Sequence, residues 1–227
     1  LPKIAQLKSL ESARRLRITP ALERSRFMRR AFLTALIFLA GISASQAAAT
    51  TETIIMLRHG EKPEQGLGQL NCQGLNRSLK LPAVIKQKFG KPDFIFAPNP
   101  AQLKEDKGAI YSYNRPLATV EPTAITFGMP VDTRFGFKDI EELQATLAQP
   151  EYRNATVLVG WEHKQIVKLA RSIVKDSGGD KALVPKWPRE DFDSMYVLRI
   201  TRDGAKTTTR FEQLKQGLNN QSASCPS

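Results

Sequence analysis

The chain places four apolar residues directly before a charged loop in the stretch IIMLRHGEK, residues 54–62. A short apolar run of this kind is typical of a strand that is buried on both faces of a sheet. The loop that follows carries His59, which is one of only two histidines in the 227 residues. A buried strand that ends at a cation, an imidazole and a glycine indicates a site at its carboxyl end, where open α/β sheets bind their ligands.

Strand-like and helix-like segments alternate along the rest of the chain. Strands are expected at 53–57, 94–97, 131–133 and 156–160, followed by a hairpin of 195–201 and 206–211 around Asp203-Gly204. Helices are expected at 71–90, with a bend or restart at Pro82, and at 117–127, 140–147 and 166–174. A polar loop is expected to precede Asn114. This order predicts an α/β fold, a three-layer sandwich with a mainly parallel central sheet, helices on both faces and an antiparallel edge.

Both histidines follow predicted strands. His59 lies two residues after the first strand, and His163 lies three residues after Gly160. One histidine alone is more often a packing or surface residue, but two at equivalent strand ends favour a shared site. Arg58 adjoins the first histidine, and Arg115 lies in the loop that leads into the next helix. Guanidinium groups bind phosphate oxygens bidentately, and nearby cations keep an imidazole unprotonated and able to attack.

The order of these residues resembles the histidine phosphatase superfamily, in its phosphoglycerate mutase-like branch. The segment LRHGE at 57–61 is similar to the family's RHGE signature. The segment YNRPLAT at 113–119 is similar to the place of the second phosphate-binding arginine, and VLVGWEH at 157–163 resembles the strand that delivers the second histidine. The resemblance implies a phosphoglycerate mutase-like fold over roughly residues 53–201.

The resemblance also implies a mechanism. His59 would accept the phosphoryl group as a phosphohistidine, while Arg58, Arg115 and His163 would hold its oxygens in a phosphate-binding site that includes His59 itself. Water would then release inorganic phosphate. Because positioning and charge neutralisation supply most of the catalysis of phosphoryl transfer, the arginines can act in place of a metal ion. No metal and no cofactor is therefore expected.

The general acid is not fixed by the resemblance. The family commonly uses a carboxyl group to protonate the leaving oxygen, and a carboxyl beside bound phosphate has a raised pKa suited to that role. Glu162, directly before His163, is the first candidate for this third catalytic residue. Glu61, Asp139 and Glu141 are its rivals. In addition, Arg77 is either a further anion contact or a surface residue of the helix after Asn71.

Two segments depart from the family's pattern. Around the second arginine the chain keeps only an outline, in Ser112, Arg115, Ala118 and Thr119. The second histidine is flanked by Glu162 and Lys164, where the family usually has serine or threonine before it and glycine after it. These differences put the recognition of the leaving group in doubt. Residues that could line the rim and favour an acidic or aromatic ester are Lys62, Lys104, Lys107, Trp161, Lys164 and Trp187.

The first 49 residues have the pattern of an export signal. Arg29 and Arg30 precede an apolar run at 31–42, and small residues follow at 41–49. The apolar run is too short to span a bilayer, which takes about 20 residues. We therefore expect a signal peptide at 28–49 that is removed, no stable membrane anchor, and a periplasmic or secreted protein.

The remaining boundaries follow from this assignment. Residues 1–27 are either an over-long translation start or an extended basic n-region, 50–215 form the histidine phosphatase-like domain, and 216–227 form a C-terminal tail. Residues 1–47 hold nine Lys and Arg and two Asp and Glu, so the net charge of +12 falls to +5 in the rest of the chain. A mild charge without a run of Lys and Arg favours small anionic ligands over nucleic acid.

The exported part contains two cysteines, Cys72 and Cys225. In an oxidising compartment they can form one long-range disulfide that ties down the C-terminal tail, but the sequence does not decide whether the two sulfurs meet.

Three functions fit these observations. The leading hypothesis is an exported phosphatase that hydrolyses a small phosphorylated substrate, a phosphomonoester. The first alternative is a binding protein that keeps the phosphate pocket without turnover. The second is a mutase that moves a phosphoryl group between hydroxyls, against which export weighs because glycolytic intermediates and a priming phosphate donor are cytoplasmic.

Overall fold

The structure, a computed structural model, describes residues 48–226, so the predicted signal peptide lies almost entirely outside the described residues. A five-stranded sheet has the strand order β2-β5-β1-β6-β7. Its strands are β1 (Thr50–Arg58), β2 (Phe94–Phe96), β5 (Thr156–Trp161), β6 (Ser194–Asp203) and β7 (Lys206–Lys215). Strand β5 lies between β1 and β2 and is parallel to both, while β6 is antiparallel to β1 and to β7. The predicted parallel sheet with an antiparallel edge is confirmed.

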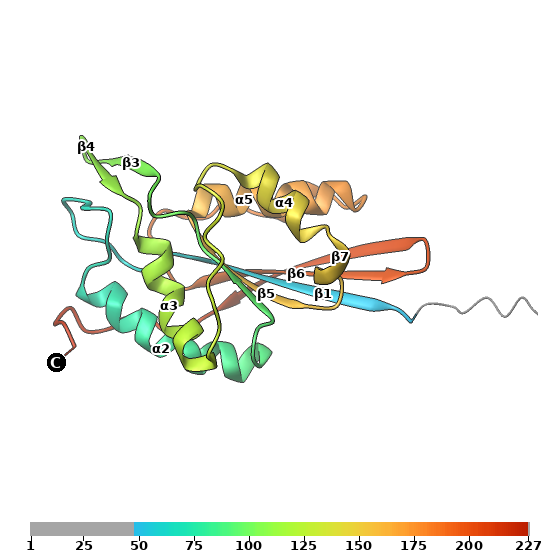
Figure 1. The fold of residues 1–227 in the computed structure, drawn as a ribbon, viewed down its shortest axis with the longest axis horizontal. Helices are drawn as coiled ribbons and strands as arrows, with labels where there is room; N and C mark the ends of the chain where they lie inside the picture. The colour runs from blue at the N-terminus through green and yellow to red at the C-terminus, as the bar shows by residue number, and fades with distance from the viewer. Residues whose placement is uncertain (1–47, 227) are drawn as a thin grey trace, which may run out of the picture. The chain divides into compact units, whose positions relative to one another are not determined.

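Helices cover both faces of this sheet (Figure 1). Helices α2 (Cys72–Phe89) and α3 (Arg115–Phe127) lie on one face, and α4 (Ile140–Leu147) and α5 (His163–Asp176) lie on the other. Two short 3-10 helices, η1 (Pro150–Tyr152) and η2 (Lys181–Leu183), complete the connections. The three-layer sandwich is therefore the one that the alternation of segments predicts.

Strand β1 holds the two halves of the core together. Because side chains alternate along a strand, Ile54 and Met56 pack among the residues of α4 and α5, whereas Ile55 and Leu57 pack among those of α2 and α3. All four side chains are completely buried. Burial of each of these side chains stabilises the folded protein by about 1.5–3 kcal/mol relative to an exposed position. This burial fixes the direction in which β1 delivers the residues that follow it.

Helix α2 packs very closely against the loop after β1. The side chain of Asn71 caps the helix by accepting a hydrogen bond of 2.9 Å from the backbone nitrogen of Gly74. A Cβ on Gly74 would lie 2.3 Å from the carbonyl oxygen of Glu61, so only glycine permits this approach. The helix continues through Pro82 to Phe89, and the predicted restart at Pro82 is wrong.

The segment before Asn114 is a hairpin and not the polar loop that the sequence suggested. Strands β3 (Leu103–Asp106) and β4 (Ala109–Ser112) form a separate two-stranded sheet. The turn between them has positive φ at Lys107 and Gly108, 56° and 82°, as in a type I′ turn. The hairpin projects at the carboxyl ends of the parallel strands (Figure 1). The strand expected at 131–133 is reduced to a single bridge between Phe96 and Asp132.

The residues after β7 are tied back to helix α2. Cys72 and Cys225 form a disulfide at a sequence separation of 153. Next to it, the side-chain amide of Asn76 donates to the carbonyl oxygens of Ser222 and Ser224, at 2.9 and 2.8 Å. The C-terminal end of the tail is thus fixed to helix α2.

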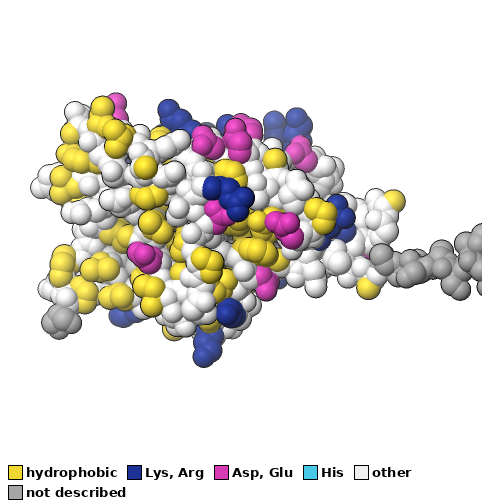
Figure 2. Space-filling view, in the orientation of Figure 1, with side chains coloured by type: hydrophobic (Ala, Val, Ile, Leu, Met, Phe, Trp, Pro, Cys, Tyr) yellow, Lys and Arg dark blue, Asp and Glu magenta, His cyan; other side chains and the backbone are white. Residues whose placement is uncertain are grey.

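On the face shown in Figure 2, acidic and basic side chains are interspersed, with apolar side chains scattered among them. In the part of the chain that the structure describes, the helices are all too short or too polar to cross a membrane.

Replacing both cysteines, Cys72→Ser with Cys225→Ser, should lower the free energy of unfolding by about 2–5 kcal/mol, because the unfolded chain loses a long covalent loop. Urea unfolding of the oxidised protein measures the loss, and reduction of the wild type should reproduce it. The double variant serves as its own control, since a reductant should leave it unchanged. Equal stability of the oxidised wild type and the double variant would contradict the pairing.

Candidate active site

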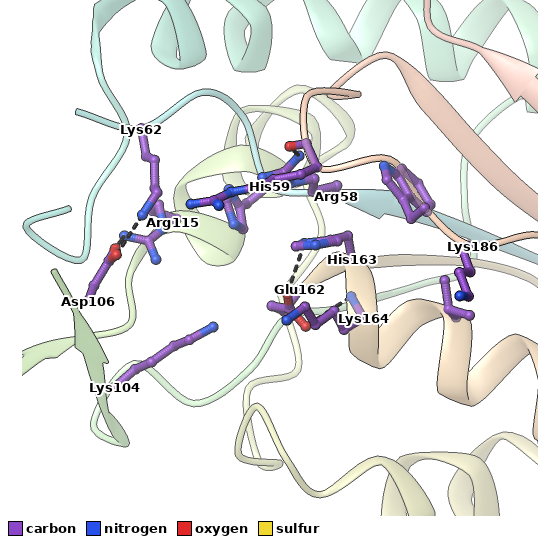
Figure 3. A pocket seen from close by; sticks show the side chains of 13 residues that line it. Arg58, His59, Lys62, Lys104, Asp106, Arg115, Glu162, His163, Lys164 and Lys186 are labelled. Carbon is purple, nitrogen blue, oxygen red and sulfur yellow. Dashed lines mark hydrogen bonds and ion pairs between the residues drawn. The ribbon is translucent and has the colours of Figure 1, made fainter. Parts of the chain in front are cut away.

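Two neighbouring parallel strands and one helix deliver the five predicted site residues to one cavity. Strand β1 ends at Arg58 and His59, strand β5 leads into Glu162 and His163, and helix α3 begins at Arg115. The register that aligns the ends of the two strands continues one residue further, where the backbone nitrogen of His59 donates to the carbonyl oxygen of Trp161 at 3.1 Å. The cavity has a volume of about 620 Å³, and all five side chains line it (Figure 3).

The imidazole of His59 is held in one tautomer. Its Nδ1 lies 2.8 Å from the carbonyl oxygen of Gly60. Because a carbonyl oxygen can only accept a hydrogen bond, Nδ1 carries the proton and Nε2 is left with a free lone pair. The side chain is only 3% exposed. Burial, reinforced by the charges of Arg115 and Arg58, holds the pKa of His59 well below its usual range, so the ring is neutral at physiological pH.

Arg58 is held by backbone carbonyl groups. It donates to the carbonyl oxygens of Arg189 and Asp191, and its guanidinium lies 3.8 Å from the centre of the Phe192 ring. Burial lowers its pKa to about 10, which still leaves the group charged at neutral pH. Its buried Nε has no hydrogen-bond partner among the described residues. A buried, charged guanidinium with a free donor is suited to bind an anion.

Arg115 is fixed from two sides. One terminal nitrogen of its guanidinium lies 3.2 Å from the carbonyl oxygen of Gly66 and 2.7 Å from a carboxylate oxygen of Asp106. Asp106 also pairs with Lys62, at 2.5 Å. Burial alone would raise the pKa of Asp106, but Lys62 and Arg115 outweigh it and hold that pKa below its usual value. The buried Nε of Arg115 again finds no partner within residues 48–226.

Glu162 begins helix α5 and contacts the second histidine. One carboxylate oxygen accepts hydrogen bonds from the backbone nitrogens of Lys164 and Gln165, at 2.9 and 3.1 Å. The other lies 2.8 Å from Nδ1 of His163. Burial raises the pKa of Glu162, but its interactions with His163, Lys104 and the helix amides are stronger, and the net effect is a lowered pKa. Glu162 is therefore ionised at neutral pH, and its carboxylate lies beside the His163 ring.

The rivals of Glu162 do not line the cavity. Glu61 forms an ion pair of 2.7 Å with Arg77. Asp139 accepts a hydrogen bond from the backbone nitrogen of Gly136, and Glu141 pairs with Lys168. Among the carboxyl groups considered from the sequence, only Glu162 lies at the site.

Both expectations for Arg77 are wrong. Its side chain is 1% exposed, and it binds Glu61, Asp193 and Gln216 instead of an anion or solvent. This network links the loop after His59 to the segments before β6 and after β7. Arg77 therefore stabilises that loop from outside the cavity. Its partners lie 16 to 139 residues away in sequence, so no local sequence pattern predicts them.

The rim differs in part from the sequence prediction. Lys62, Lys104, Lys164 and Trp187 line the cavity, whereas Lys107 lies in the turn of the hairpin and Trp161 is a core residue. Asp106, Lys186 and Arg189 also line the cavity and were missed. The Lys107-Gly108 pair was the available signal for Asp106, because it marks the tight turn directly after that residue.

No protein-family profile matches the chain, and no curated protein matches it in sequence. Solved structures do match. One is a mycobacterial hydrolase, "Mycobacterial hydrolase 2", with 15% identity, a TM-score of 0.51, and coverage of 71% of this chain and 89% of the other. Another is a mycobacterial glucosyl-3-phosphoglycerate phosphatase in complex with inorganic phosphate, with 14% identity, a TM-score of 0.51, and coverage of 71% and 95%.

These similarities concern the fold. The chain has a phosphoglycerate mutase-like α/β fold, as the resemblance of its sequence implies. At this level of identity, the activity and substrate of the matched proteins do not carry over with the fold.

The titration of His59 is open to direct measurement, because the chain has only two histidines. Since its pKa is lowered, His59 should stay neutral, with the proton on Nδ1, when the pH falls from about 8 to 5, where an unperturbed histidine becomes charged. Nitrogen-15 NMR of the labelled imidazoles reads the tautomer and the titration, and a His163→Asn variant assigns the signals. A His59 ring that titrates near 6.5 would contradict this electrostatic description.

The same lowered pKa predicts a pH dependence of stability. The unfolded chain takes up a proton on His59 below about pH 6.5, whereas the folded protein does not, so stability is lost as the pH falls below that value. Urea unfolding at a series of pH values should therefore show a steeper acid slope for the wild type than for a His59→Ala variant.

Proposed function

We propose that this protein is an exported phosphatase that hydrolyses a phosphomonoester through a phosphohistidine on His59. The observation that carries the proposal is the pairing of a buried, neutral imidazole with two buried guanidinium groups, Arg58 and Arg115, which both keep an unpartnered Nε within the described residues. This arrangement combines a nucleophile with donors for the phosphoryl oxygens.

In the first step, Nε2 of His59 attacks phosphorus, and the bond between phosphorus and the ester oxygen breaks. Arg58 and Arg115 neutralise the charge on the phosphoryl oxygens during the transfer, and His163 helps to hold these oxygens. The leaving oxygen takes a proton and departs as an alcohol. In the second step, water attacks phosphorus, the bond to Nε2 breaks, and inorganic phosphate leaves. The hydrogen bond from Nδ1 to Gly60 keeps Nε2 directed at the substrate throughout.

Glu162 is our candidate for the proton donor. It is ionised at neutral pH, but a bound phosphate dianion adds negative charge beside it and raises its affinity for a proton. Its carboxylate stays in place because helix α5 and His163 hold both oxygens. The same group can then accept a proton from the attacking water in the second step.

Export is supported by two separate observations. The first 49 residues have the composition of a signal peptide, and a single disulfide joins Cys72 to Cys225. Disulfides persist in oxidising compartments and are rare in the cytosol. We therefore propose a periplasmic or secreted protein.

The variant His59→Ala should lose turnover of 4-nitrophenyl phosphate by about a thousandfold or more, because it removes the nucleophile itself. The wild type, quenched during turnover of a phosphorus-32 ester, should carry an acid-labile label on the peptide that contains His59. Retained binding of inorganic phosphate by the variant shows that its pocket is intact. A wild type that binds phosphate but turns over no ester would favour the binding protein, and label on His163 would refute the assignment of the nucleophile.

The role of Glu162 is tested by the dependence on the leaving group. If Glu162 protonates the leaving oxygen, Glu162→Gln should lower kcat by about 10²-fold or more for an alkyl phosphate, and far less for 4-nitrophenyl phosphate, whose leaving group needs no proton. Glutamine keeps an oxygen for the helix cap, so the comparison is made within one fold. An equal loss for both esters would instead assign Glu162 to positioning His163.

A further inference from the structure

The cavity carries more positive charge than a phosphomonoester needs. Seven lysine and arginine side chains line it and only two carboxylates, Asp106 and Glu162, an excess of seven minus two, or five, positive charges. A phosphomonoester brings at most two negative charges at neutral pH. Arg58 and Arg115 are placed to take the phosphoryl group, and Lys62 is already paired with Asp106.

Four cations remain after this assignment: Lys104, Lys164, Lys186 and Arg189. Within residues 48–226, none of them forms an ion pair. Lys164, Lys186 and Arg189 are exposed, so water and salt screen their charges. Lys104 is different because it is partly buried and held in place by neighbouring side chains.

Two aromatic rings hold the amine of Lys104. Its Nζ lies 4.4 Å from the centre of the Tyr113 ring and 4.9 Å from that of Phe137, both within the range of cation–π contacts. Figure 3 shows the amine directed into the space between Arg115 and Glu162. The two carboxylates of the cavity are occupied elsewhere, Asp106 by Lys62 and Arg115, and Glu162 by helix α5 and His163. Lys104 is thus a fixed, partly desolvated cation that Glu162 and Asp106 attract only at longer range and that forms no ion pair within residues 48–226.

The hairpin explains how Lys104 reaches the site. Lys104 lies opposite Tyr111 in the β3–β4 register, and Asp106, two residues further on the same strand, binds Arg115. Alternate residues of a strand share one face, so the face that secures Arg115 also presents Lys104 to the cavity. The hairpin therefore adds a second cationic position beside the phosphate position.

We infer that Lys104 binds a second acidic group of the substrate, a carboxylate or another phosphate, so that the substrate class is a phosphomonoester with a further anion in its alcohol part. This inference rests on the proposed phosphatase function, because it takes the phosphoryl group to lie between His59, Arg58 and Arg115. The cavity of about 620 Å³ lies within the roughly 300–1,000 Å³ typical of small-molecule sites, so it can hold more than a phosphate.

The test uses esters that differ only in the second anion: ethyl phosphate with phosphoglycolate, and propyl phosphate with 3-phosphonooxypropanoate. The variant Lys104→Met removes the charge and keeps an apolar stem against Tyr113 and Phe137. Its kcat/KM for each carboxylated ester should fall about tenfold or more relative to its kcat/KM for the matching plain ester, a ratio in which any general effect of the lost charge on the site cancels. Lys107→Met is the matched control, since it removes one charge from the same hairpin at a residue outside the cavity, and it should leave all four values unchanged.

A binding measurement makes the result independent of turnover. Calorimetry with propylphosphonate and 3-phosphonopropanoate, which cannot be hydrolysed, should show that the wild type prefers the carboxylated compound and that Lys104→Met loses this preference. If the wild type hydrolyses no ester but shows the preference, the phosphatase proposal fails and the assignment of Lys104 stands. Equal losses for plain and carboxylated compounds, which would place Lys104 on the transferred phosphoryl group, or no loss for either, would overturn the inference.

Discussion

The parallel pairing of β1 with β5 is the constraint on which the site depends. It aligns Arg58 with Trp161, so that the residues just beyond both strands emerge side by side. The core enforces this alignment, because a shift of one residue would move Ile54 and Met56 from the core beneath α4 and α5 to the core beneath α2 and α3 and would disrupt the packing on both faces. The two histidines are more than a hundred residues apart in the chain, and no contact of their own brings them together.

A cluster of positive charge can persist in this partly buried place because backbone groups hold it. Carbonyl oxygens of Arg189 and Asp191 orient Arg58 without neutralising it, whereas Arg115 is held by the carbonyl oxygen of Gly66 and by Asp106, a carboxylate that it shares with Lys62. The arginines thereby remain available to an anion, and they also keep His59 neutral. By contrast, Arg77 forms ion pairs with Glu61 and Asp193, and these two carboxylates neutralise its charge. The same residue type thus serves in binding or in support according to the partner that burial assigns to it.

The hairpin β3–β4 lies outside the sandwich and contributes residues to the cavity. The layers of the sandwich place His59, Arg58 and Arg115, for which we propose the roles of nucleophile and phosphoryl-binding cations. The hairpin adds Lys104 and Asp106 on one strand face, beyond the ends of the sheet and outside the core, and our inference gives Lys104 the recognition of the leaving group. The hairpin connects through Tyr113 to α3, and the Tyr113 ring contacts Arg115 at the start of that helix.

The sequence by itself determined the α/β layers and the strand ends that carry Arg58, His59 and His163, because periodicity and apolar runs depend on residues that are close in the chain. Only the tertiary structure decided the partners of Arg77, the pairing of Cys72 with Cys225, and the contact of Asp106 with Lys62. These contacts join segments 16 to 153 residues apart, and packing, not local pattern, selects them. The hairpin was missed for a related reason. Short polar strands carry little hydrophobic signal, so their pairing is evident only in the tertiary structure.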